Sequence, residues 1–207
     1  MKNCEATSTL PKSNKDACVG ALNEEHSILK DAVRELEEAR KTVDSDDEED
    51  NDPLDEGENK WEEKDSKIMN PSIGLMKATA ALTKKTGSAV AKYGKNDSKE
   101  ELAEYDSVVK HMGELSPAVD DLAMCLYPPV SWTECRKAAD KLKSVAMKAL
   151  QFLGVTHFMT SEEAKNWRSF VEKAFEHNYS EIDRVMVEHG LQNLRVEDFE
   201  VNQVPAE

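Results

Sequence analysis

SWTECRKAADKLKSVAMKALQFL, residues 131–153, has the apolar spacing of an amphipathic α-helix. Ser131 followed by Glu134 three residues later is the pattern of a capping box, which predicts where this helix begins. Gly154 predicts its end. A helix of this kind buries its apolar face against other helices. That face would carry Cys135, Ala138, Ala139, Leu142, Val145, Ala146, Ala149, Leu150 and Leu153.

The same spacing recurs on both sides of this stretch, and no segment has the alternation of a convincing strand. The sequence therefore predicts an all-α protein, an antiparallel helical bundle of about six helices with an acidic disordered loop. The other five helices are predicted over residues 15–43, 72–93, 98–112, 116–126 and 160–189.

Local start signals predict where several of these helices begin. Asn70-Pro71-Ser72 is expected to open the second helix, and Ser98 to cap the third. Ser116-Pro117 is expected to start the fourth, because serine caps well and proline suits the first helical position. Residues 160–163, Thr-Ser-Glu-Glu, form a second capping-box pattern before the sixth helix.

Charge is distributed unevenly along the 207 residues. The formal net charge is −15, and residues 44–58 contain ten carboxylates and no base. Such a run buries too little apolar surface to offset its chain entropy, so it is predicted to be disordered. The expected organisation is a flexible N-terminus (1–13), a first bundle helix (14–43), an acidic disordered linker (44–66), a helical bundle (67–190) and a loosely ordered tail (191–207).

Composition argues against several classes of function. An acidic chain is repelled by phosphate backbones and by anionic lipid, so neither nucleic acid nor a membrane is an expected partner. No signal peptide or membrane span is visible. The four cysteines lack CxxC spacing and are interpreted as reduced thiols of an intracellular protein.

Motifs that would indicate catalysis are missing from the sequence. It has no phosphate-binding glycine loop, no nucleophile elbow and no HExxH, and its five histidines lack ligand spacing. Asp120-Asp121 could serve acid–base chemistry, but placement in a first helical turn already accounts for them. We therefore predict no enzyme, no cofactor and no metal site. For the acidic run, weak cation binding is the most that its spacing supports.

Two short motifs have competing interpretations. Ser45 precedes four acidic residues, the context that acid-directed kinases require, so it is a candidate phosphorylation site; a plain solubilising loop fits equally well. Arg34-Glu35-Leu36 matches the RxL pattern of some cyclin-docking segments. Leu36 lies on the apolar stripe of the first helix, however, so a core role is favoured.

The helices on either side of Tyr127-Pro128-Pro129 could form a helix-loop-helix unit. The residues before it are acidic, so a DNA-binding version with its basic region is excluded. Such a unit could pair with the helices of a partner protein. Two consecutive helices of one bundle are the simpler interpretation.

The segment GELSPAVDDLAMCLYPP, residues 113–129, closely resembles the signature of the cyclin-D-binding protein 1 family, also called GCIP. Residues 10–15, the acidic interruption and Trp61-Glu62-Glu63 are similar to the family in the same order. The resemblance covers most of residues 10–187 and corresponds to the C-terminal half of family members. The signature residues with a candidate partner contact are Ser116, Pro117, Asp120, Asp121, Leu122, Tyr127, Pro128 and Pro129.

The resemblance implies a non-enzymatic regulator of the cell cycle in the cytoplasm and nucleus. Its expected partners are D-type cyclin and helix-loop-helix proteins, and it would restrain cell-cycle progression. The zipper ascribed to the family is not legible here, and the oligomeric state stays open. The alternative is a vinculin- or catenin-like bundle adaptor that binds no cyclin, because long antiparallel helices with small-residue faces fit that class as well.

Overall fold

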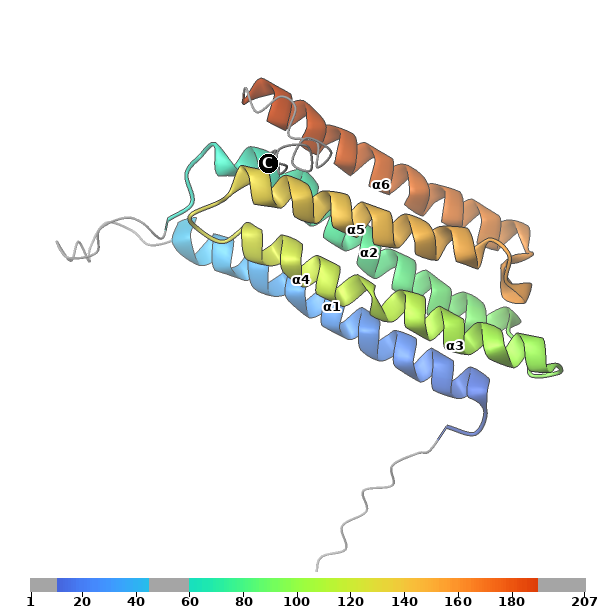
Figure 1. Cartoon of the computed structure of the whole chain (residues 1–207). Coiled ribbons are helices and arrows are strands. Elements are labelled where there is room, and N and C mark those ends of the chain that lie inside the picture. The colour runs from blue at the N-terminus through green and yellow to red at the C-terminus, as the bar shows by residue number, and fades with distance from the viewer. Residues whose placement is uncertain (1–10, 45–59, 190–207) are drawn as a thin grey trace, which may run out of the picture.

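The computed structural model of the chain describes residues 11–44 and 60–189, and within these ranges it contains helices and no strand. The helices pack as an antiparallel bundle (Figure 1), so the predicted all-α fold is confirmed. The elements in chain order are α1 (Asn14–Asp44), α2 (Asp65–Tyr93), α3 (Lys99–Gly113), α4 (Leu115–Cys125), α5 (Trp132–Leu153), the 3-10 turn η1 (His157–Met159) and α6 (Glu162–Glu188).

Helix α2 lies between α1 and α6. It packs against α1 on one side and α6 on the other, and it also contacts α4, α5 and η1. Helices α3 and α4 follow one another along nearly the same line and together run beside α1 (Figure 1). The core between these helices is mainly aliphatic, and fully buried side chains include Leu22, Leu29, Leu36, Leu75, Leu82, Leu142 and Phe175. The core interpretation of Leu36 is therefore confirmed.

Helix α2 begins seven residues earlier than predicted, at Asp65 instead of Ser72. Pro71 lies inside the helix and does not open it. The seven added residues are held by tertiary contacts, because Ile68 and Met69 are completely buried there. The Asp65 carboxylate also accepts a hydrogen bond from the Glu62 backbone N–H at 2.9 Å. Burial of these residues therefore outweighs the loss of the backbone hydrogen bond that Pro71 cannot make.

Helix α4 does not use Ser116 as its cap, contrary to the prediction. The helix begins at Leu115. Glu114 is the C-cap residue of α3 and also the N-cap residue of α4. The backbone N–H of Ser116 donates instead to Oε1 of Glu25 on α1, at 3.1 Å. A carboxylate from another helix thus satisfies a donor that a local cap would otherwise take.

The remaining caps agree with the predictions in part. Ser98 and Glu101 form a complete capping box at α3. Ser131 caps α5 by accepting from the Glu134 N–H at 3.5 Å, but the Glu134 carboxylate pairs with Lys137, so the reciprocal half of that box is not formed. At α6 the cap is Ser161 rather than Thr160.

Buried hydroxyls follow one side of α2 through the core. Those of Thr79, Thr83 and Thr86 donate to backbone carbonyls one turn earlier. Ser72 is fully buried, and its hydroxyl has no hydrogen-bond partner among the residues that the structure describes. A buried polar group without a partner costs free energy.

Replacing Ser72 by alanine is therefore expected to stabilise the protein. The expected gain is about 1 kcal/mol, because the substitution removes an unpaired hydroxyl and introduces the best helix former. The midpoint of urea unfolding followed by circular dichroism measures it. Thr86→Val is the matched control: it removes a hydroxyl that is hydrogen-bonded and should bring no gain. A loss of stability in Ser72→Ala would contradict the prediction.

Some sequence predictions fall outside the described residues. The central part of the acidic linker, the phosphorylation candidate Ser45, the first ten residues and the tail 191–207 all lie there. At the described edge of the linker, residues 65 and 66 belong to α2. The domain boundaries otherwise stay predictions.

Candidate protein-interaction site

The signature segment 113–129 turns one side of α4 into the core. Five of its apolar residues are buried: Leu115, Ala118, Val119, Leu122 and Ala123. Leu126, just after the helix, is also completely buried. Of the predicted contact residues, Leu122 is therefore a core residue that no partner can touch while the bundle is closed.

The other side of α4 and the loop after it face solvent. Met124 is 73% exposed, the largest exposure of any apolar residue on α4. Pro117, Asp120, Tyr127 and Pro129 are also exposed. Asp121 pairs with Lys141 of α5 at 2.5 Å, so its charge is partly neutralised on the surface.

The loop after α4 is held by a tryptophan that precedes α2. The Trp61 indole N–H donates to the backbone carbonyl of Leu126 at 2.7 Å. Its ring also lies 6.0 Å, centroid to centroid, from that of Tyr127. We call the surface made by Trp61, Met124, Tyr127, Pro128 and Pro129 the aromatic corner.

A second tryptophan fixes the other end of the same loop. Trp132, the first residue of α5, is 7% exposed. Its indole N–H donates to Oδ1 of Asp65 at 3.2 Å. Asp65 is 4% exposed and uses its other oxygen to accept from the Glu62 N–H. Residues on both sides of the loop are therefore anchored to the start of α2, which favours a preformed surface.

Two cysteine thiols lie near the C-terminal end of α4. The Cys135 thiol donates to the backbone carbonyl of Cys125 at 3.1 Å, and the Cys125 thiol donates to that of Asp121 at 3.1 Å. Burial is the main cause that raises the pKa of Cys135, to about 12, and that raises the pKa of Cys125. Thiols with raised pKa values are poor nucleophiles, so both are interpreted as structural.

Stability is expected to fall at alkaline pH because of such thiols. An unfolded cysteine ionises near pH ~8.5, whereas native Cys135 keeps its proton until about pH 12, so unfolding releases a proton between these values. Cys18, whose pKa burial raises to about 11, acts in the same direction. Between about pH 8 and about pH 10, Cys135 is expected to lower the free energy of unfolding by about 1–2 kcal/mol. Full stability is present below the unfolded pKa.

Urea titrations at both pH values test this, with Cys135→Ser as the comparison. Serine does not ionise in this range, so the variant should lose less stability than the parent chain on going to the higher pH. Equal losses in the two proteins would contradict the assignment to Cys135. Cys125→Ser, at a more exposed thiol, is the matched control.

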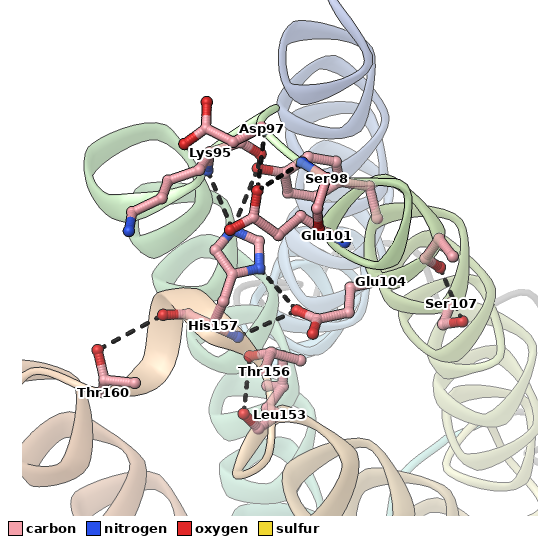
Figure 2. A network of polar contacts seen from close by, with 12 residues as sticks. Lys95, Asp97, Ser98, Glu101, Glu104, Ser107, Leu153, Thr156, His157 and Thr160 are labelled. Carbon is pink, nitrogen blue, oxygen red and sulfur yellow. Dashed lines mark hydrogen bonds and ion pairs between the residues drawn. The ribbon is translucent and has the colours of Figure 1, made fainter.

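A separate polar cluster surrounds His157 near the N-terminal end of α3 (Figure 2). His157 Nδ1 lies 2.7 Å from Oε2 of Glu104, and the backbone N–H of Lys95 donates to its Nε2 at 3.0 Å. The Tyr105 hydroxyl donates to the Lys95 carbonyl at 2.5 Å. Both ring nitrogens are engaged, so this histidine links η1, α3 and the turn after α2.

The described part of the chain contains neither a metal-binding cluster nor a membrane-spanning helix. Within residues 11–44 and 60–189, His, Cys, Asp and Glu side chains form no group of three that could hold a metal ion. None of the helices in that part of the chain combines the length and apolar character needed to cross a membrane.

The structure separates the predicted contact residues into three groups. Leu122 is in the core, and Ser116 and Pro128 are half-buried. The exposed group is Pro117, Asp120, Tyr127, Pro129 and the paired Asp121. Sequence reasoning missed the exposure of Met124 and the two indole hydrogen bonds. Partners of those bonds are 65 and 67 residues apart in the chain, so local spacing contains no signal for them.

Fold and site together define an all-α helical-bundle protein with an exposed aromatic corner. Comparison with known proteins then gives the family. Residues 21–151 match the sequence model of the family described as Grap2 and cyclin-D-interacting, C-terminal. The chain belongs to this family, as its signature segment predicted.

Relatives include proteins from three vertebrates. The chain is 35% identical over 182 residues to the Cyclin-D1-binding protein 1 homolog of Xenopus laevis, covering 84% of this chain and 54% of that protein. It is 32% identical over 191 residues to Cyclin-D1-binding protein 1 of Homo sapiens, covering 84% and 52%. The homolog of Danio rerio is 29% identical over 186 residues, covering 86% and 54%. The chain thus spans about half the length of these curated relatives.

Proposed function

We propose that this protein is a non-enzymatic, protein-binding regulator of the cell cycle that binds a D-type cyclin through the aromatic corner and restrains cell-cycle progression. The observation that carries the proposal is the match of residues 21–151 to the Grap2 and cyclin-D-interacting family. The relatives named above are cyclin-D1-binding proteins. Such a regulator would act in the cytoplasm and the nucleus.

The aromatic corner is favoured as the contact because it combines exposure with rigidity. Met124 and Tyr127 present apolar surface to solvent, and aromatic and methionine side chains are enriched in protein interfaces. Trp61 and Trp132 hold the loop between α4 and α5 from both ends, which lowers the entropy cost of binding. The exposed Asp120, one helical turn before Met124 on α4, would select for a basic partner surface.

A helix-loop-helix partner is a less direct candidate. Pairing of that kind would use the apolar faces of α4 and α5, and both faces are buried within this bundle. Binding by exchange of helices would therefore require the bundle to open. A contact through the exposed corner requires no such change, so we favour the cyclin.

The test is equilibrium binding of the whole chain to a purified D-type cyclin, measured by calorimetry. Met124→Glu is expected to weaken binding by about tenfold or more, because it places a charge in the proposed apolar contact. Phe170→Glu is the matched control, since Phe170 is 72% exposed on α6 and the substitution makes the same change in charge. Circular dichroism verifies that both variants are folded.

The outcomes separate the alternatives. Loss of binding in Met124→Glu alone supports the aromatic corner, whereas equal effects in both variants would overturn it. A folded chain that binds no D-type cyclin would contradict the proposed function. Co-sedimentation of that chain with actin would then favour the bundle adaptor.

A further inference from the structure

Positive charge gathers on one helix of this acidic protein. Helix α2 contains five lysines, and its single carboxylate, Asp65, is buried and hydrogen-bonded. The solvent-facing side of α2 is therefore basic, although the chain as a whole carries −15. Two cavities flank the first half of this side.

The cavities lie on either side of Asn70, which lines both. One, of about 420 Å³, lies between α1 and α2 and is lined by Arg40, Lys41 and Lys77 among others. The second, of about 440 Å³, lies between α2 and α6 and includes Lys67 and Arg184. We call the two together the double cleft. Its lining contains five cations and three carboxylates.

The carboxylates of the double cleft form ion pairs with cations of the same cleft, whereas several of its cations have no carboxylate partner among the described residues. Glu37 pairs with Lys77 at 2.6 Å, and Glu181 and Glu188 both pair with Arg184. Arg40 donates to two neutral oxygens, those of Asn70 at 2.8 Å and Ser66 at 3.1 Å. Among the residues that the structure describes, Arg40, Lys41 and Lys67 form no ion pair. Arg40 is thus positioned by neutral groups, with its charge left for a ligand.

The size of the double cleft indicates what could lie in it. From Lys67 to Lys77 the helix rises about 15 Å at ~1.5 Å per residue. An extended peptide of about five residues, at ~3.3 Å each, covers the same distance. Gly74 lines the first cavity, and the Asn178 side chain of α6 occupies the space that a side chain at position 74 would need.

We propose that the double cleft binds a short acidic segment, rich in aspartate and glutamate, of a protein partner. The cations Arg40 and Lys41 contact its carboxylates from one side, and Lys67 does so from the other. The site uses residues other than those of the aromatic corner and goes beyond the proposed function. A partner that also binds the aromatic corner could engage both surfaces.

The test is fluorescence anisotropy of a labelled octaglutamate peptide titrated with the whole chain at low salt. The double variant Arg40→Gln/Lys41→Gln is expected to weaken binding about fivefold, as two surface ion pairs are lost. Lys84→Gln/Lys85→Gln is the matched control, because it removes the same charge from exposed positions farther along α2. That control should change the affinity less than about twofold.

Several results would overturn the proposal. Equal weakening by the two double variants would mean attraction to general positive charge, and absence of peptide binding would mean that there is no site. Tighter binding of a short single-stranded oligonucleotide would favour a nucleic acid as the occupant. A dimer in sedimentation velocity that dissociates in Arg40→Gln/Lys41→Gln would identify a second copy of the chain.

The proposed function is tested separately by the same variants. Cyclin binding that survives in Arg40→Gln/Lys41→Gln while peptide binding is lost would support the double cleft as an independent site. If Met124→Glu keeps peptide binding and loses cyclin binding, the two surfaces are distinct. Peptide binding therefore tests the double cleft, and cyclin binding tests the aromatic corner independently.

Discussion

Leu122→Asp is expected to abolish cooperative folding at 25 °C. Leu122 lies on the inner side of α4 and is 0% exposed, so the new carboxylate would be buried among aliphatic side chains with no partner. The expected loss is about 5 kcal/mol or more, from the lost apolar contact together with the cost of burying the polar group. A loss of that size is comparable to the whole stability of an ordinary domain. Circular dichroism during thermal unfolding measures it.

Met124→Asp is the matched comparison two residues away. Met124 is 73% exposed, so an aspartate at this position remains in water. The free energy of unfolding should stay within about 0.5 kcal/mol of that of the parent chain. A cooperative, parent-like melt of Leu122→Asp would contradict the placement of Leu122 in the core. Loss of partner binding in a Leu122 variant therefore reports unfolding, whereas in a Met124 variant it reports the contact.

Trp132→Ala is expected to lower the free energy of unfolding by about 4 kcal/mol. Removal of a buried tryptophan leaves a cavity, and such changes cost about 3–5 kcal/mol. The indole ring is 7% exposed and lies 3.8 Å, centroid to centroid, from the ring of His189. Asp65 would also lose the donor to its Oδ1 and keep only the Glu62 N–H. Urea unfolding followed by circular dichroism gives the value.

Trp132→Phe separates the hydrogen bond from the packing. Phenylalanine fills most of the space but donates nothing, so it leaves one oxygen of a buried carboxylate without its partner, at a cost of about 1–3 kcal/mol. Asp65→Asn in the Trp132→Phe background should then recover part of the loss, because an amide is less costly to bury than a carboxylate. Equal stability of Trp132→Phe and the parent chain would show that the hydrogen bond contributes nothing measurable.

Local signals in the sequence were sufficient for most of the fold. Ser98 with Glu101, and Ser131 before α5, predict helix starts because a cap acts on groups three residues away. The apolar spacing of residues 131–153 predicts which side of α5 is buried, because helix geometry places such residues on one face. Where a start depended on distant groups, as for α2 at Asp65 and α4 at Leu115, the sequence interpretation was wrong.

The sequence predicted which segment contains the candidate site, but not which of its residues are exposed. The motif of residues 113–129 led to the family, but helical spacing alone did not distinguish a partner-facing residue such as Met124 from a buried one such as Leu122. That distinction depends on which sides of α4 are covered by α1 and α5. The double cleft likewise arises only where α1, α2 and α6 meet.

By itself, the amino-acid sequence determined that this protein is a bundle of amphipathic helices and to which family it belongs, because both rest on residues close together in the chain. The tertiary structure alone decided which surfaces are available. The Trp61–Leu126 and Trp132–Asp65 hydrogen bonds and the Glu25–Ser116 contact each join residues at least 65 positions apart. Such pairs meet only after several helices have packed, since their energies depend on the relative position of whole helices and not on the spacing within any one of them.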